Sequence, residues 1–309
     1  MQAPSRTTAT LIGITAVPIW STLAVLAAVA GKIPPFQLNA MAFLIAGLIG
    51  AASWLRRPHA ARALIQPLAA WATGIAGLFG YHFLYFTALQ GAPPIPASLI
   101  NYLWPLLIVV FSALLPGERL GWHHMVGAAM GLAGTVVVVT GGGGVAIAPE
   151  HVPGYLAALG AALFWSVYSV LSRKHAAVPT DAVTGFCLAT AVLSAVCHLA
   201  LEETVWPAGW QQWAAVVGLG LGPVGGAFYF WDYGLKRGDI QVMGVSAYGA
   251  PLLSTLLLIL FGYGAFTLPV AAAALLITGG AVIAAKDMLF RRRRRGDLQA
   301  PIPEPRSEL

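Results

Sequence analysis

Ten apolar runs, each long enough to cross a lipid bilayer, occupy most of this chain of 309 residues. A helix needs about 20 mainly apolar residues to cross the hydrocarbon core. The runs are residues 9–30, 36–55, 64–90, 94–115, 120–141, 153–172, 182–201, 210–235, 240–262 and 266–290. We expect all ten to be helices, because lipid cannot satisfy open backbone groups and the runs lack the alternation of barrel strands.

The low content of charged residues excludes a water-soluble globular fold. Charged residues make up 9% of the chain, against about 25% in soluble domains. The net charge is +6, but the basic residues flank apolar runs, and five arginines, residues 291–295, follow the last run directly. This placement predicts contact with the bilayer surface and no nucleic acid partner.

The distribution of the basic residues predicts the orientation of the chain. With a cytoplasmic N-terminus and ten alternating spans, sixteen of the seventeen Lys and Arg residues fall on the cytoplasmic side, and only Lys32 falls on the other. Cytoplasmic loops carry the excess of Lys and Arg in membrane proteins. We therefore expect a multi-pass protein of the cell inner membrane with both termini in the cytoplasm.

The two halves of the chain resemble each other at an offset of 145 to 146 residues. The aligned positions are Trp20 with Trp165, Ser21 with Ser166, Tyr102 with Tyr248, Pro105 with Pro251 and Gly134 with Gly280. Each half contains five spans, and five is an odd number, so the second copy enters the bilayer from the opposite face. Many secondary transporters have this architecture, with a substrate site near the midplane where the repeats meet.

The predicted fold is an all-α integral membrane protein of ten transmembrane helices, arranged as two inverted five-helix repeats. The first repeat is residues 1–145, the second is residues 146–290, and a basic cytoplasmic tail follows at residues 291–309.

Polar and aromatic side chains inside the spans predict a substrate site. The stretch Asn-Tyr-Leu-Trp-Pro at residues 101–105 combines an amide with large rings, and Ser98 lies on the same helix face as Asn101. Such a set suits a small ligand with polar and aromatic parts. The candidate substrate-binding residues are Trp20, His82, Ser98, Asn101, Tyr102, Trp104, Trp165, Tyr168, Ser246 and Tyr248.

Two prolines at matching positions, Pro105 and Pro251, are predicted to kink their helices beside the transport pathway. A proline inside a helix removes one hydrogen bond and frees the carbonyl four residues earlier. Lipid cannot satisfy a freed carbonyl, so we expect both sites to face protein or a wet cavity. The alternative is a kink that only improves packing.

Asp232 is an acidic residue late in its apolar run. An ionisable group at membrane depth is a functional candidate. Lys236 lies four residues later, where an ion pair within one helix is equally compatible with the spacing. The role of Asp232 therefore stays open between function and structure.

Two other classes of membrane protein fit the sequence less well. An intramembrane enzyme needs a catalytic constellation at depth, such as Ser with His or paired Asp residues, and Asp232 is the only deep Asp candidate. A channel often shows charged rings or a filter loop, and neither is visible. We expect a carrier and not an enzyme, with a passive facilitator as an alternative.

Five stretches carry a resemblance to a known family: residues 9–13, 20–22, 101–105, 164–166 and 244–251. Through them the chain resembles the drug/metabolite transporter superfamily of the EamA type, and within it the exporters of aromatic amino acids. The resemblance spans nearly the whole chain.

The resemblance implies a ten-helix fold with a central cavity, export of Phe, Tyr, Trp and related or toxic compounds, and no metal or nucleotide cofactor. No obligate protein partner is evident. Many relatives carry a Gly-Glu pair after helices four and nine, but here only Gly117-Glu118 has the acid, and Gly262-Tyr263-Gly264 lacks it. A broad-specificity metabolite or drug exporter, or a passive facilitator with a different substrate, remains the alternative.

Overall fold

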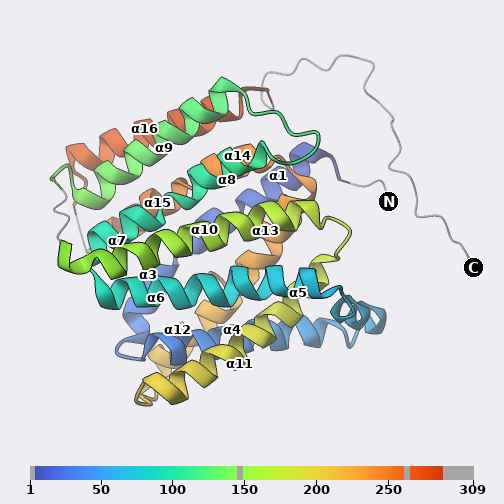
Figure 1. Cartoon of the computed structure of the whole chain (residues 1–309). Coiled ribbons are helices and arrows are strands. Elements are labelled where there is room, and N and C mark those ends of the chain that lie inside the picture. The colour runs from blue at the N-terminus through green and yellow to red at the C-terminus, as the bar shows by residue number, and fades with distance from the viewer. Residues whose placement is uncertain (1–3, 145–148, 261–264, 288–309) are drawn as a thin grey trace, which may run out of the picture.

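The computed structural model describes residues 4–144, 149–260 and 265–287, and every regular element in these ranges is a helix (Figure 1). The predicted all-α class is therefore confirmed. The predicted boundary between residues 145 and 146, the end of the second repeat at residue 290 and the basic tail at residues 291–309 lie outside the described residues.

The helices of the first half follow the first five apolar runs. They are α1 (Arg6–Ile14), α2 (Ala16–Ser21), α3 (Leu23–Ala30), α4 (Pro35–Ser53), η1 (Pro58–Leu64), α5 (Leu68–Ile75), the π-helical η2 (Ala76–Gly80), α6 (Tyr81–Gly91), α7 (Pro94–Asn101), α8 (Trp104–Ser112) and α9 (Trp122–Thr140). In sequence, α1 to α3 correspond to the first run, α5 to α6 to the third, and α7 with α8 to the fourth.

The helices of the second half follow the remaining five runs. They are η3 (Pro149–His151), α10 (Val152–Lys174), η4 (Thr180–Ala182), α11 (Val183–Leu201), α12 (Trp210–Leu221), α13 (Gly226–Arg237), α14 (Ile240–Ser246), α15 (Gly249–Leu260) and α16 (Leu268–Ala284). Here α12 with α13 correspond to the eighth run, and α14 with α15 to the ninth.

The helices show that this is a multi-pass membrane protein. Within the described residues, seven helical stretches are long and apolar enough to cross a bilayer, and an eighth qualifies if η1 and the stretch from α5 to α6 count together across a bend of 86°. Two shorter apolar helices complete the series, residues 96–112 and 268–284. Leucines such as Leu199 and Leu275 are about four-fifths exposed, at 80% and 77%, as lipid-facing side chains are.

Several helices are interrupted near their middle. Thr15 and Thr22 mark the breaks on either side of α2, and each hydroxyl donates to a carbonyl three residues earlier. A break at residues 102–103 precedes Pro105, and a break at residues 247–248 precedes Pro251. Broken helices near the midplane are typical of transporters with inverted repeats.

The contacts between helices recur in pairs when the two halves are exchanged. The helices α9 and α16 pack together, as do α4 and α11, and each of these pairs joins corresponding helices of the two halves. Likewise α10 packs on α6, as α1 packs on α13. Figure 1 shows α9 and α16 at one edge of the bundle, α4 and α11 at the opposite edge, and α10 between them.

Ion pairs and hydrogen bonds define the two ends of the bundle. At one end, Glu118 contacts Arg6 at the start of α1 and Arg173 at the end of α10. We call this end, with Arg6, Glu118, Arg173 and Asp239, the basic end. At the opposite end, which we call the far end, the carboxylate of Glu202 after α11 accepts hydrogen bonds from the first amides of α4, at 2.9 and 3.0 Å.

Candidate functional site

Four tryptophans from both halves of the chain meet in the middle of the bundle. The ring of Trp20 on α2 lies 6.1 Å from that of Trp104 on α8, 5.9 Å from that of Trp165 on α10 and 5.0 Å from that of Trp231 on α13. Phe228 lies 5.5 Å from Trp165 and joins the same group. We call these five residues the aromatic cluster. Most of the rings meet edge to face, which is a favoured geometry for aromatic pairs.

Hydrogen bonds from α10 fix the position of the aromatic cluster. The Ser166 hydroxyl donates to the carbonyl of Trp104 at 3.1 Å, which holds the first turn of α8 against α10. The indole nitrogen of Trp231 donates to the Ser169 hydroxyl at 3.3 Å. The first contact joins helices of opposite halves and the second joins two helices of the second half, and both satisfy polar atoms that would be costly to bury without a partner.

Polar side chains lie against one side of the aromatic cluster. The Tyr81 ring is 5.3 Å from Trp165 and stacks on Tyr85 at 5.9 Å. The amide nitrogen of Asn101 donates to the Tyr81 hydroxyl at 3.2 Å, and the Tyr85 hydroxyl lies 3.5 Å from that of Ser98. We call these residues, together with Tyr102 next to Asn101, the polar rim.

One atom of the polar rim has unused hydrogen-bonding capacity. Asn101 is buried, and its side-chain oxygen has no hydrogen-bond partner among the described residues. A buried acceptor left unpaired costs about 1–3 kcal/mol. The atom is therefore available to a donor group of a ligand, such as an ammonium.

Exposure differs between the two sides of the site. Trp104, Trp165, Phe228 and Trp231 are all buried. Trp20 and the rim residues Tyr81, Tyr85, Ser98 and Tyr102 are only half-buried. In sequence, Ser98 lies four residues from the far-end terminus of its helix, whereas Trp231 lies six residues from the basic-end terminus of α13. Four of the five rings of the aromatic cluster are thus more deeply buried than most of the polar rim.

His82 lies beside the aromatic cluster but is enclosed by rings. Its ring is 5.2 Å from Phe43 and 6.3 Å from Phe228, and its Nδ1 atom pairs with the Leu78 carbonyl at 2.6 Å. The π-helical turn η2 ends just before it, and such turns are frequent at functional sites.

The predicted residues of the second half are placed differently. Tyr168 packs on Trp165, with the two rings 5.1 Å apart, on the side toward the basic end. Tyr248 lies in a separate apolar cluster with Leu252 and Ile277, and its hydroxyl accepts a hydrogen bond from the Leu106 amide at 3.2 Å. Ser246 is half-buried at the end of α14. The contacts of the described residues do not join Tyr248 to the aromatic cluster.

Sequence reasoning missed four aromatic members of the site, namely Tyr81, Tyr85, Phe228 and Trp231, and it also missed Phe43 beside His82. One available signal was the spacing of Phe228, Trp231 and Asp232, which puts all three on one face of a helix. For Phe43 and Tyr81 we find no signal in the pattern of the sequence.

At the basic end, one carboxylate joins the two halves of the chain. The Arg6 and Arg173 guanidinium groups donate to the two oxygens of Glu118, at 2.8 and 2.7 Å. Arg173 also donates to the Leu235 and Lys236 carbonyls at the end of α13. Burial opposes ionisation of the Glu118 carboxyl, but the bonds and charges of Arg6 and Arg173 outweigh it and hold its pKa below the ordinary value.

Two histidines elsewhere in the described residues lie next to acidic side chains. His198 lies 3.0 Å from Glu202 near the far end, and His123 lies 3.4 Å from Asp287 near the basic end. Among the described residues, no group of three or more His, Cys, Asp or Glu side chains is placed to hold a metal ion.

The sequence matches the pattern of the EamA-like transporter family twice, over residues 7–140 and 152–285. The chain is 58% identical to a protein of Ancylobacter novellus named aromatic amino acid exporter YddG, over 84% of this chain and 91% of that one. A protein of the same name from Salmonella typhimurium is 27% identical, over 81% of this chain and 87% of the other.

A solved crystal structure is also similar to this chain. The two share 56% sequence identity and superpose with a TM-score of 0.88, over 93% of this chain and 100% of the other. The arrangement of helices described above is therefore shared with an experimentally solved protein.

Proposed function

The chain belongs to the EamA-like transporter family, and from this premise we propose that it is a secondary transporter that exports aromatic amino acids and related small organic or toxic compounds. The family and the named relatives are transporters and exporters, so the protein is a transporter and not an enzyme. Among the observations on this chain, the aromatic cluster with its polar rim carries the proposal. Rings and an unpaired amide oxygen in the middle of the bundle match the two parts of an aromatic amino acid.

For the topology, we propose ten crossings of the inner membrane, with repeats at residues 1–145 and 146–290 and with both termini and the tail at residues 291–309 in the cytoplasm. The alternation of helix ends between the basic end and the far end supports this, as does the bias of sixteen basic residues to one side. The basic end then faces the cytoplasm, because cytoplasmic loops carry the Lys and Arg excess.

We propose that transport works by alternating access around the aromatic cluster. The Glu118 ion pairs and the buried rings lie toward the basic end, while the polar rim is partly exposed, and this supports an assignment of the structure to a state closed at the basic end. This conformation therefore presents the site to the outside. The inward-facing conformation requires the Glu118 contacts to Arg6 and Arg173 to break, since they tie α1 to α10.

Within the site, the substrate ring lies against Trp20 and Tyr81, where partly exposed faces remain. The Asn101 oxygen accepts a hydrogen bond from the substrate ammonium, and hydroxyls of Ser98 and Tyr102 donate to the substrate carboxylate.

Other predicted residues support this site. Trp104 and Trp165 lie beneath the substrate ring, and His82 packs behind the aromatic side chains. Pro105 follows the helix break that positions Asn101. Tyr168, Ser246, Tyr248 and Pro251 remain predicted contributors to the pathway in other conformations.

Counterflow in proteoliposomes tests this function. Vesicles that contain purified protein and a high internal concentration of unlabelled phenylalanine should take up labelled phenylalanine transiently and with saturation. Aspartate inside the vesicles, which lacks a ring, should not drive this uptake. The absence of counterflow for all three aromatic amino acids would refute the proposed substrate class.

The same vesicles separate the second candidate, a passive facilitator with a channel-like pathway. Flux that rises linearly with concentration and shows no counterflow would favour a channel over a carrier. Repeating the counterflow with and without a pH gradient measures whether proton movement is coupled to export.

A further inference from the structure

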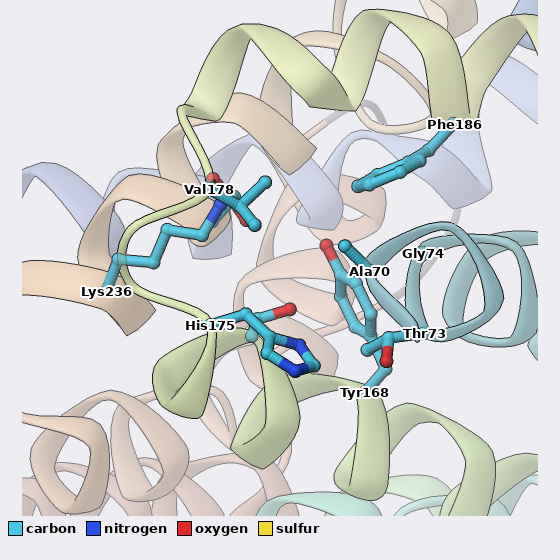
Figure 2. A pocket seen from close by; sticks show the side chains of 10 residues that line it. Ala70, Thr73, Gly74, Tyr168, His175, Val178, Phe186 and Lys236 are labelled. Atoms are coloured by element: carbon cyan, nitrogen blue, oxygen red, sulfur yellow. Dashed lines mark hydrogen bonds and ion pairs between the residues drawn. The ribbon is translucent and has the colours of Figure 1, made fainter. Parts of the chain in front are cut away.

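A narrow pocket lies between the aromatic cluster and the basic end (Figure 2). It is lined by side chains of α5, α10, α11 and α13, among them Tyr168, His175, Phe186, Asp232 and Lys236. In this conformation it has room for about one water molecule. The proposed function gives no role to the charged side chains of this pocket.

The pocket contains the most deeply buried ion pair in the described part of the chain. Lys236 Nζ lies 2.8 Å from Asp232 Oδ2, and the two side chains are 3% and 1% exposed. Burying a charge inside a spanning helix is costly, and such residues usually mark a substrate or ion pathway. A pair on one helix that only needed to stay neutral could be replaced by apolar side chains at no loss of stability.

Two further polar atoms point to a ligand. Tyr168 is 2% exposed, and its hydroxyl lies near the Ser172 side chain but makes no hydrogen bond of regular geometry to any described residue. The Nδ1 atom of His175 is likewise buried without a hydrogen-bond partner among the described residues. Figure 2 shows the Tyr168 ring reaching from α10 into the space between His175 and Phe186.

On the basis of the proposed function, we infer that this pocket is the cytoplasmic loading site for the zwitterionic head group of the amino acid. In the inward-facing conformation the substrate ammonium binds Asp232, and its carboxylate binds Lys236 and the Tyr168 hydroxyl. The substrate ring lies against Phe186. The pair that Asp232 and Lys236 form in this structure is the empty, closed state of the site.

The position of the pocket connects it to the aromatic cluster. Asp232 directly follows Trp231, and Tyr168 packs on Trp165. An amino acid that leaves the pocket toward the outside therefore passes Trp231 and Trp165 and reaches the polar rim. The aromatic cluster contributes no ionised side chain of its own, so the loading site supplies the full charges that recognise both ends of a zwitterion.

The test compares transport from the two faces of the membrane. Proteoliposomes of known orientation contain wild type, Lys236→Met, Asp232→Asn or the double variant, and labelled phenylalanine is offered from one face at a time. Each single variant should raise the half-saturation concentration at the cytoplasmic face by about tenfold, the loss expected for one charge-assisted hydrogen bond. At the outer face the change should stay below about twofold.

Ligand selectivity gives a second readout. Phenylalanine methyl ester lacks the carboxylate, and 3-phenylpropionate lacks the ammonium. Wild type should bind both more weakly than phenylalanine at the cytoplasmic face. Lys236→Met should abolish the preference for phenylalanine over the methyl ester. Asp232→Asn should abolish the preference for phenylalanine over 3-phenylpropionate.

A matched control neutralises the ion pair of Arg57 and Asp181, which is 3.0 Å long and lies near the same end of the bundle with side chains 50% and 30% exposed. Arg57→Met with Asp181→Asn should leave both half-saturation concentrations unchanged. If the pocket variants shift both faces equally, or lower only thermal stability, the pair is structural and the inference is wrong.

Two outcomes keep this inference separate from the proposed function. A wild type that transports no aromatic amino acid refutes the function itself. If the charge variants do not fold, Tyr168→Phe removes only a hydroxyl whose one polar neighbour is Ser172, and it should raise the cytoplasmic half-saturation concentration a few-fold. An unchanged value for that variant overturns the loading site while export remains intact.

Discussion

Residues 101–105 and 247–251 occupy equivalent places in the two halves, yet they differ in what they contact. In the first, Asn101 and Trp104 reach the polar rim and the aromatic cluster. In the second, alanines stand at the positions of Asn101 and Trp104, and Tyr248 is fully buried in an apolar cluster. Only the tyrosine and the proline are common to both stretches.

The difference shows how a duplicated scaffold becomes specialised. Both copies keep the helix break and the proline, which shape the backbone at the midplane. The Tyr248 hydroxyl accepts a hydrogen bond from the amide next to Pro105, so the second copy supports the first instead of offering its own contacts. At these two helix breaks, the groups that can contact a ligand are thus concentrated in the first copy.

Replacing the tryptophan that the second copy lacks should have the largest effect. Trp104→Ala removes one of the buried rings of the aromatic cluster, and we expect phenylalanine counterflow to fall by roughly tenfold or more, since a lost aromatic contact with a ring costs about 1–3 kcal/mol. Trp104→Phe keeps a ring and should retain most of the activity.

Trp206→Ala is the matched control for the tryptophan. Trp206 is 65% exposed and stacks on Trp213 near the far end, away from the aromatic cluster. The Trp206→Ala variant should show the same phenylalanine counterflow as the wild type. Equal losses in Trp104→Ala and Trp206→Ala would mean that Trp104 has no special role at the site.

The amide of the first copy is the second place to test the comparison. Asn101→Leu keeps the volume but removes the unpaired oxygen, and we expect the half-saturation concentration for phenylalanine to rise by about tenfold, the cost of one hydrogen bond to a charged group. Asn101→Asp keeps an acceptor and should lose less affinity. Equal affinity in wild type and Asn101→Leu would show that the substrate does not contact this amide.

Much of this arrangement could be predicted from the sequence. Hydrophobic run length gave the helices, because a bilayer requires long apolar segments. Trp20, Trp104 and Trp165, which the sequence places inside apolar runs as candidate site residues, meet in the structure. The depth of a residue in the membrane follows from its distance to the ends of its apolar run, which can be counted in the sequence.

The direction in which a side chain points around its helix was harder to predict. Tyr248 matched Tyr102 in depth and identity, but α15 packs against α16 and α9, and the ring lies over Gly131, where an added Cβ atom would clash with it. Phe43 and Phe228 come from helices far apart in the chain, and their rings stack with centroids 5.6 Å apart. Only the packing of helices decides which rings of such distant segments meet.

The matched tyrosines Tyr248 and Tyr102 are expected to differ in role, the first in stability and the second in substrate binding. Tyr248→Phe removes a buried hydrogen bond to the Leu106 amide, so we expect a loss of about 1–2 kcal/mol in unfolding free energy with little change in half-saturation. Tyr102→Phe should leave thermal stability unchanged and raise the half-saturation concentration a few-fold. Thermal melting in detergent measures the stability of each variant, and counterflow measures its half-saturation concentration. A raised half-saturation concentration in Tyr248→Phe would show that the second copy, too, binds substrate.

The smallest effect is expected at Glu118, an acid that follows the fourth run and is replaced by Gly264 at the aligned position of the second copy. Because Arg6 and Arg173 lower the pKa of the Glu118 carboxyl in the folded protein, its stabilisation is fully present above the ordinary value of 4.5 and is lost as the pH falls through the lowered value. Glu118→Gln should melt about 2 °C below wild type at pH 7, since Arg6 is half-exposed and partly screened pairs contribute about 1 kcal/mol or less.

The pH dependence distinguishes this ion pair from a packing effect. The difference in melting temperature between wild type and Glu118→Gln should persist down to about pH 5 and shrink only below the ordinary pKa of 4.5. Glu203→Gln, at an exposed acid near the far end, should match wild type throughout. If the difference in melting temperature stays constant across this pH range, it comes from packing of the Glu118 side chain. The contacts at the basic end would then not depend on the Glu118 charge, which has no counterpart in the second copy.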